Sequence, residues 1–149
     1  MDGNSLDQAV LAWEYIIQED KLTISNVLKT HKILMLNQPI AGFQRGYFRR
    51  VGVRIGRRYG ASWEKVPDLM KEWVMFANLD KKWKEIKASH VRFENIHPFV
   101  DGNGRLGRIL MNWARVKNKL EILVIREEEK YDYYDWFNAK VAKSVTAPI

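Results

Sequence analysis

Apolar residues recur every three or four positions through most of this sequence, and only the stretch 40–60 departs from that spacing. Such periodicity puts apolar side chains on one face of an α-helix, so it predicts a chain of amphipathic helices. Two helices are expected first. One begins at a capping box of Ser5 and Gln8 and runs to about Gln18, and the next covers 24–35 and stops before Pro39.

The stretch 40–60 differs because it is rich in glycine, a residue that weakens helices. Within it, Val51, Val53 and Ile55 alternate with Gly52 and Arg54. Alternation with a period of two is typical of a strand with one buried face. This stretch therefore predicts a short β-hairpin or exposed strand, the single β-like piece of the sequence.

Helical spacing resumes after residue 60 and recurs in separate segments as far as residue 141. Helices are expected from 62 or 67 to 77, from 83 to 93 with Asp80 as the N-cap, from 105 to 116, and over 131–141. The expected fold class is all-α with one short β-hairpin. A chain of 149 residues can bury one sizeable core but is short for two, so one domain spanning 1–149 is expected.

Composition narrows the class of protein further. The sequence has no cysteine, which excludes disulfides and thiolate metal sites. It has no apolar run of about 20 residues and no secretory signal at its start, so we expect a soluble, cytoplasmic protein. The 25 Lys and Arg against 18 Asp and Glu give a net charge of +7. That surplus attracts nucleotides, nucleic acid or an acidic protein, without deciding between them.

The densest run of reactive side chains is HPFVDGNGRLGR, at residues 97–108. We expect one helix to end at 97–98 and another to begin near residue 104, so that 102–104 form a turn into a helix N-terminus. Unpaired amides and the positive end of the helix dipole favour an anion at such a place. Glycine in the turn lets a phosphate approach the backbone closely. The segment therefore predicts a phosphate-binding turn.

Three kinds of side chain around this turn complete a reactive set. Arg105 and Arg108 are three positions apart on the new helix, so both can face the same polyphosphate. Asp101 precedes the turn and can bind Mg²⁺ together with phosphate oxygens. His97 is the nearby group that can accept a proton near neutral pH. The residues thus predict a nucleotide, a metal ion and a base that deprotonates a hydroxyl.

Simpler interpretations exist for each feature alone. A Gly-Asn-Gly turn is a common connector between helices, and the arginine-rich window 45–58 fits a nucleic-acid patch. His31 and His90 lie in apolar helical runs, so we expect both, like the tryptophans, to be core residues. Glu94 and His97 match one element of di-iron helical bundles, with His90 on the same face. That site needs a second such element, which the sequence lacks.

The run 97–108 resembles the signature of the Fic domain family, His-x-Phe-x-(Asp/Glu)-Gly-Asn-Gly-Arg-x-x-Arg, and satisfies every fixed position. The likeness extends upstream to His90, Phe93 and Ile96. It also includes Gly46-Tyr47-Phe48-Arg49 with Val53 and Ile55, which are similar to the β-hairpin flap of Fic proteins. In all it covers residues 20–140.

This resemblance implies a helical Fic fold that transfers AMP from ATP, with Mg²⁺, to a Ser, Thr or Tyr hydroxyl of a target protein. By the same resemblance His97 is the general base, Asp101 is the Mg²⁺ ligand and Phe99 anchors the loop. The residues implied in nucleotide binding are Gly102, Asn103, Gly104, Arg105 and Arg108. The residues implied in a flap that aligns the target by strand addition are Arg49, Val51, Val53 and Ile55.

Some features leave alternatives open. Gly104 favours AMP transfer, since the related Doc kinases tend to have lysine at that position, but transfer of UMP, phosphocholine or a phosphoryl group fits the same signature. A basic binding module without activity is the alternative from another class.

The inhibitory Ser/Thr-x-x-x-Glu-Gly/Asn element of many Fic proteins is absent from the sequence. Three alternatives follow: inhibition by a separate protein, as in toxin–antitoxin pairs, an inhibitory element outside this chain, or an enzyme without such regulation. Of these, the separate inhibitory protein is preferred. Neither a membrane nor a nucleic acid is expected as a partner, and a translocated effector remains an alternative to a resident cytoplasmic enzyme.

Overall fold

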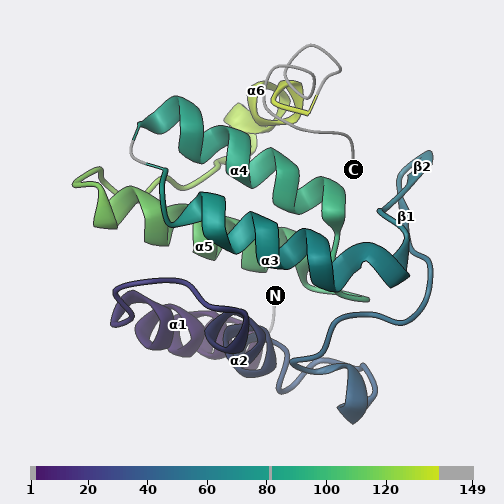
Figure 1. The fold of residues 1–149 in the computed structure, drawn as a ribbon. Helices are drawn as coiled ribbons and strands as arrows, with labels where there is room; N and C mark the ends of the chain where they lie inside the picture. The colour runs from purple at the N-terminus through teal and green to yellow at the C-terminus, as the bar shows by residue number, and fades with distance from the viewer. Residues whose placement is uncertain (1–2, 81, 138–149) are drawn as a thin grey trace.

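The computed structural model describes residues 3–80 and 82–137. These residues form six α-helices and one two-stranded antiparallel hairpin, which confirms the predicted fold class (Figure 1). The helices are α1 (Gly3–Ile17), α2 (Ile24–Leu34), α3 (Val66–Ala77), α4 (Trp83–Ile96), α5 (Asn103–Lys117) and α6 (Lys130–Asp135). The strands are β1 (Arg54–Ile55) and β2 (Arg58–Tyr59), and short 3-10 helices occur at η1 (Gly42–Gln44), η2 (Trp63–Lys65) and η3 (Glu127–Glu129).

The first two helices pack side by side, below α3, α4 and α5 in the view of Figure 1. Helix α2 begins at Ile24 because Thr23 caps it: the Thr23 hydroxyl accepts the Asn26 N–H at 3.0 Å, and Asn26 Oδ1 accepts the Thr23 N–H at 2.8 Å. The capping box predicted at Ser5 is wrong, since α1 already begins at Gly3. Gln8 instead donates from Nε2 to the Ile33 carbonyl on α2, at 2.7 Å.

The start of α4 also differs from the prediction. Helix α4 begins at Trp83, and the Lys82 N–H donates to Glu85 Oε1 at 3.0 Å. Asp80 is therefore too early in the chain to be the N-cap. Its carboxylate accepts a hydrogen bond from the Ser89 hydroxyl, in the second turn of α4. Asp80 thus ties the α3–α4 connection to the side of the helix, and Glu85 instead accepts the N–H of the N-cap residue Lys82.

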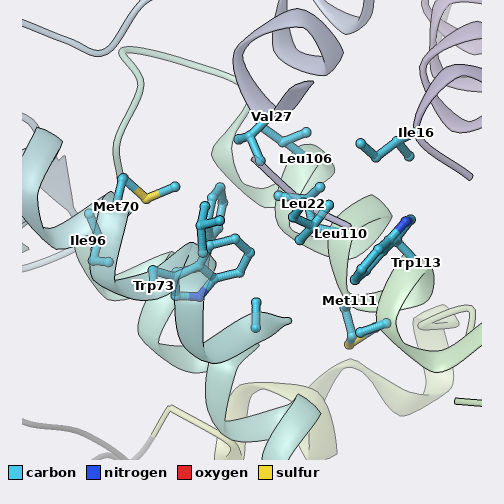
Figure 2. Close-up of a cluster of buried hydrophobic side chains, with 14 of the residues drawn as sticks. Ile16, Leu22, Val27, Met70, Trp73, Ile96, Leu106, Leu110, Met111 and Trp113 are labelled. Atoms are coloured by element: carbon cyan, nitrogen blue, oxygen red, sulfur yellow. The ribbon is translucent and has the colours of Figure 1, made fainter. Parts of the chain in front are cut away.

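One apolar cluster contains residues of all five helices from α1 to α5 and fixes their relative positions. Its members include Ile16, Leu22, Val27, Met70, Trp73, Ile96, Leu106, Leu110, Met111 and Trp113 (Figure 2). Two buried tryptophans satisfy their indole N–H groups on carbonyls, Trp73 on Ser89 at 2.8 Å and Trp113 on Glu19 at 2.9 Å. Across the described parts of the chain, no helix is both long and apolar enough to span a membrane. The cluster holds α4 and α5 rigidly at the point where the motif joins them.

The hairpin stands out from the helices near the N-terminal end of α3 (Figure 1). Arg54 pairs with Tyr59 and Ile55 with Arg58, and Gly56 takes a positive φ of 61° at the first turn position, where two-residue hairpins favour glycine. The predicted hairpin is confirmed, although its paired part is shorter than the alternation from Val51 indicates. At the other end of the chain, the predicted helix 131–141 begins at Lys130 in α6, and its part beyond residue 137 lies outside the described residues.

Candidate active site

The reactive segment begins where α4 ends, at His97. This residue adopts a left-handed conformation (φ 52°, ψ 63°) while its N–H still donates to the Phe93 carbonyl at 3.0 Å. Pro98 cannot continue the helix, so the chain turns there. The turn is then closed by Asn103, whose side chain accepts the Phe99 N–H at 2.9 Å and donates to the Phe99 carbonyl at 2.8 Å. The Asn103 side chain therefore shapes the loop, and its backbone N–H remains the group that can meet a ligand.

Phe99 anchors this loop in the core, with no exposed surface. Its ring stacks on His31 of α2, with centroids 3.8 Å apart and planes at 7°. His31 Nδ1 accepts the Gly46 N–H at 3.0 Å, so Nε2 carries the proton and donates to the Asp101 carbonyl at 2.9 Å. Burial lowers the pKa of His31 to about 4, which keeps it neutral. The expectation that His31 is a core residue is confirmed, and the structure adds that it supports the motif loop.

Helix α5 begins directly after Gly102, which takes a φ of +84°. A Cβ at this position would lie 2.6 Å from Met35 Sδ, so both the conformation and the close approach to α2 require glycine. The Gly102 N–H donates to Asp101 Oδ1 at 2.8 Å. By helix geometry the N–H groups of the first turn of α5 have no intrahelical acceptor. They form the positive end of a 15-residue helix.

Residues 102–104 at the start of α5 line a cavity of about 310 Å³, here named the phosphate cavity after the group that its residues are predicted to bind. Every motif residue predicted to act on the nucleotide lines it. Arg105 and Arg108 lie on the same side of α5 and both line it, as their spacing predicts. Asp101 is exposed at the cavity and belongs to no cluster of three or more His, Asp or Glu that could hold a metal, as far as the described residues go. The cavity is lined by His97, Val100, Asp101, Gly102, Asn103, Gly104, Arg105 and Arg108.

His97 contributes an imidazole with one defined free nitrogen. Its Nδ1 lies 3.1 Å from the Glu94 carbonyl, which can only accept, so Nδ1 carries the proton and Nε2 the lone pair. Burial lowers the pKa of His97, and the Arg49 and Arg58 cations lower it further, against the opposing effect of the Glu94 carbonyl. His97 is therefore a neutral base near neutral pH, with Nε2 as the atom that can accept a proton.

A buried carboxylate that the sequence did not single out for this site lies behind Arg108. Glu94 Oε1 is buried and has no hydrogen-bond partner. A Cβ at Gly107 would overlap this oxygen, so the glycine in the first turns of α5 makes room for the carboxylate. Burial raises the pKa of Glu94 to about 8, although the Arg108 cation opposes that rise. Glu94 is thus a group whose charge can change near neutral pH beside a cation of the phosphate cavity.

His90 is a core residue, as expected, and not a metal ligand. Its Nδ1 donates to the Gly107 carbonyl at 3.2 Å, and its Nε2 accepts the Tyr133 hydroxyl at 2.9 Å. Burial lowers the pKa of His90 to about 4. Both ring nitrogens are therefore occupied by structural partners, and the iron-binding face considered with Glu94 and His97 does not form.

Arg49 occupies a different place from the other predicted flap residues. Its side chain is buried, and its guanidinium donates to the carbonyls of Val51 at 2.8 Å, His97 at 2.6 Å, Ile96 at 3.2 Å and Ala61. Burial lowers its pKa. Four of the five N–H donors of the guanidinium are thus used by carbonyls of the chain itself, so Arg49 fastens the base of the flap to the end of α4. By contrast Val51 is exposed, and Val53 and Ile55 are half-buried on the hairpin.

Comparison with known proteins gives one consistent family. The model of the Fic/DOC family matches residues 21–114. Proteins named protein adenylyltransferase Fic are similar: that of Drosophila melanogaster is 29% identical over 150 residues, covering 90% of this chain and 30% of the relative. The Aedes aegypti protein is 29% identical over 153 residues, covering 91% and 30% respectively. The chain thus spans less than a third of the length of these curated relatives.

Solved structures agree with this likeness. A Fic domain containing signaling protein from Bacteroides thetaiotaomicron superposes with a TM-score of 0.76 at 26% identity, covering 90% of this chain and 55% of that one. A Fic family protein from Desulfovibrio desulfuricans G20 has a TM-score of 0.69 at 25% identity, covering 94% of this chain and 45% of that one. The helical arrangement around the motif is shared with both.

Proposed function

Because the chain belongs to the Fic/DOC family, we propose that its 149 residues form one domain that acts as a protein adenylyltransferase, transferring AMP from ATP to a hydroxyl side chain of a target protein. One observation carries this proposal: His97 Nε2 is the free nitrogen of a neutral imidazole at a cavity that also holds a helix N-terminus and two arginines. A base and a polyphosphate site in one cavity are what such a transfer needs. The adenylyltransferase names of the relatives favour AMP over other groups.

In the proposed reaction, His97 acts on the acceptor hydroxyl. Nε2 accepts the proton of a Ser, Thr or Tyr hydroxyl as its oxygen attacks the α-phosphorus of ATP, and pyrophosphate leaves. The hydrogen bond from Nδ1 to the Glu94 carbonyl holds the ring in the correct tautomer and orientation. The lowered pKa keeps Nε2 unprotonated at neutral pH, which is the state a general base requires.

The phosphates are proposed to lie at the start of α5. Backbone N–H groups of Asn103 and Gly104 would hold the α- and β-phosphates, with Gly102 providing the turn that exposes them. Arg105 and Arg108 would bind the outer phosphates, since a guanidinium offers paired donors to phosphate oxygens. These contacts neutralise the charge of the leaving pyrophosphate, which supplies much of the rate enhancement in phosphoryl-type transfer.

The residues at the cavity can hold Mg²⁺ only if the phosphates of the nucleotide supply further oxygen ligands. Asp101 is an exposed carboxylate at the cavity, and one of its oxygens already accepts the Gly102 N–H. Mg²⁺ commonly binds through one carboxylate plus substrate phosphates, and its octahedral shell is completed by water. Asp101 would hold the ion, which would offset the charge of the phosphates when bound.

Two further surfaces are proposed to meet proteins. The flap residues Val51, Val53 and Ile55 lie along or before β1, whose outer edge can pair with an extended segment of the target. A separate inhibitory protein is proposed to cover the apolar cavity of about 400 Å³ between α1 and α5. Arg105 and Arg108 form one side of that cavity, so a carboxylate of the inhibitor could occupy the place of the outer phosphate.

The proposed transfer is tested with ATP labelled either at the α- or at the γ-phosphate, incubated with the chain, Mg²⁺ and a cell lysate. We expect label from the α-position on protein and none from the γ-position. His97→Ala should reduce that label by about 10²–10⁴-fold while ATP binding persists, since general-base catalysis contributes roughly that factor. Label from the γ-position alone would replace the proposal with a kinase, and labelling that survives His97→Ala would remove His97 as the base.

A further inference from the structure

A second, larger cavity lies on the other side of the motif loop. It has a volume of about 840 Å³ and is lined mainly by large apolar side chains from 42–51, η2 and the motif loop. We name it the aromatic groove, after Phe43, Tyr47, Phe48, Val51, Trp63 and Val100. Phe43 is 76% exposed and Tyr47 62% exposed. Single exposed aromatic residues are ordinary, but several that converge on one cavity mark a binding surface.

The aromatic groove is continuous with the proposed reaction site. Val100 of the motif loop lines both the groove and the phosphate cavity. Arg49 also lines the groove, and its Nε donates to the His97 carbonyl at 2.6 Å. Val51, the first exposed flap residue, forms another part of the same wall. A segment whose hydroxyl reaches His97 and whose backbone follows the flap therefore passes directly beside the groove.

The charged residues near the groove indicate the net charge of the target segment that can lie there. The flap presents exposed arginines at 50, 54, 57 and 58, and Arg50 is also part of the groove wall. Glu64 is an exposed acidic residue on the opposite wall. Cations outnumber anions along the path, in a chain whose net charge is +7. A segment that lies there without repulsion is acidic, and a second copy of this basic chain fits the charge poorly.

We propose that the aromatic groove binds a bulky apolar side chain of the target, a few residues from the acceptor hydroxyl, in a segment rich in Asp and Glu. This inference rests on the proposed transfer to a protein hydroxyl. It assigns to the groove the selection of the target, while the phosphate cavity binds the nucleotide. Burial of one large side chain in such a pocket gives roughly tenfold or greater discrimination against a small one.

The test uses fluorescein-labelled peptides as probes, each with a central Ser, Thr or Tyr among Asp and Glu. In each peptide one flanking position carries either Phe or Ala, and equilibrium binding to the whole chain is measured by fluorescence polarisation. We expect the Phe peptide to bind about tenfold more tightly at one position or two adjacent positions. Replacing the acidic residues by Lys should weaken binding of every peptide.

Two variants assign the effect to the groove. Phe43→Ala should remove most of the preference for Phe without changing the affinity for the Ala peptide, and its high exposure means that truncation leaves the core intact. Trp63→Leu provides a second change on the opposite wall. Tyr131→Ala is the matched control, because Tyr131 is 72% exposed on α6, away from the groove. The preference for Phe should be unchanged in that control.

The outcomes separate this inference from the proposed function. Peptide preference that is absent, or that Phe43→Ala and Trp63→Leu leave intact, overturns the groove as the docking site even if α-label is transferred to protein. A chain that dimerises through these same residues also overturns it, and places a second copy in the groove. Peptide preference with no transfer from ATP sustains the groove and removes the transferase proposal.

Discussion

At the scale of single residues, Glu94 is a buried carboxyl group whose charge can change near Arg108 of the site. Its Oε1 is buried without a partner, in the space that Gly107 leaves open, with Arg108 as the nearby cation. A buried, unpaired carboxylate is costly when ionised, which is why its pKa is raised from 4.5 to about 8. Glu94 is therefore protonated in the folded chain at neutral pH but ionised in the unfolded chain.

Glu94→Gln should change how stability depends on pH. Between pH 4.5 and about 8 the folded chain holds one proton more than the unfolded chain, so the folded wild type loses stability as pH rises. The glutamine variant lacks this loss. The difference between the two free energies of unfolding, variant minus wild type, should therefore increase by up to about 1.4 kcal/mol per pH unit in that window. Urea unfolding of both chains from pH 5 to pH 9 measures it. A difference that stays flat, or that falls as pH rises, contradicts the assignment.

Residue roles could be predicted from the sequence only where local spacing determines them. The run 97–108 predicts the phosphate turn because all its members lie on one loop and one helix start. His31 supports that loop through a contact with Asp101, 70 positions away, and nothing in its apolar helical run indicates this. Glu94 stands out in the sequence only as part of a di-iron element, and its burial near Arg108 does not follow from local spacing. Both roles depend on how α2, α4 and α5 pack.

At the scale of elements, the hairpin flap and the α4–α5 turn behave as one unit because Arg49 joins them. Its guanidinium donates to carbonyls at the flap, at the end of α4 and at Ala61. A planar guanidinium can serve several carbonyls at once, which an ammonium or an apolar side chain cannot. The flap therefore keeps a fixed position relative to His97.

Arg49→Met should destabilise the chain by about 2–4 kcal/mol, because it leaves buried carbonyls without donors while keeping most of the side-chain volume. Arg57→Met is the matched control, since Arg57 is exposed in the hairpin turn, and it should change stability by less than about 0.5 kcal/mol. Guanidinium chloride unfolding of the two variants compares them. Equal stability of both variants would show that the carbonyls find other partners and that Arg49 is not the link.

The elements themselves were predicted better than their beginnings. Helical periodicity located α1 to α5 because each of these helices contributes buried residues to the same core. The N-caps were wrong at Ser5 and Asp80, since each residue has a cap-type side chain but lies within a helix or before its start. Ser and Asp side chains also serve other partners, as Asp80 serves Ser89. Tertiary packing decides which use prevails.

At the scale of the whole molecule, the motif loop borders two neighbouring cavities, which share Val100. The loop 97–102 is fixed by Phe99 in the core, by His31 from α2 and by Arg49 from the flap. Because these supports come from different parts of the chain, the fold keeps the phosphate cavity and the aromatic groove in a fixed arrangement. In the proposed reaction, this loop brings His97 Nε2 to the phosphates of the nucleotide at the start of α5.

The most direct test of this arrangement is a crystal structure of His97→Ala with ATP and Mg²⁺ bound, since loss of the base preserves the nucleotide. We expect the triphosphate along the first amides of α5, with Arg105 and Arg108 on its outer phosphates and the α-phosphorus facing position 97. A nucleotide bound elsewhere, or one whose α-phosphorus points away from position 97, would contradict it.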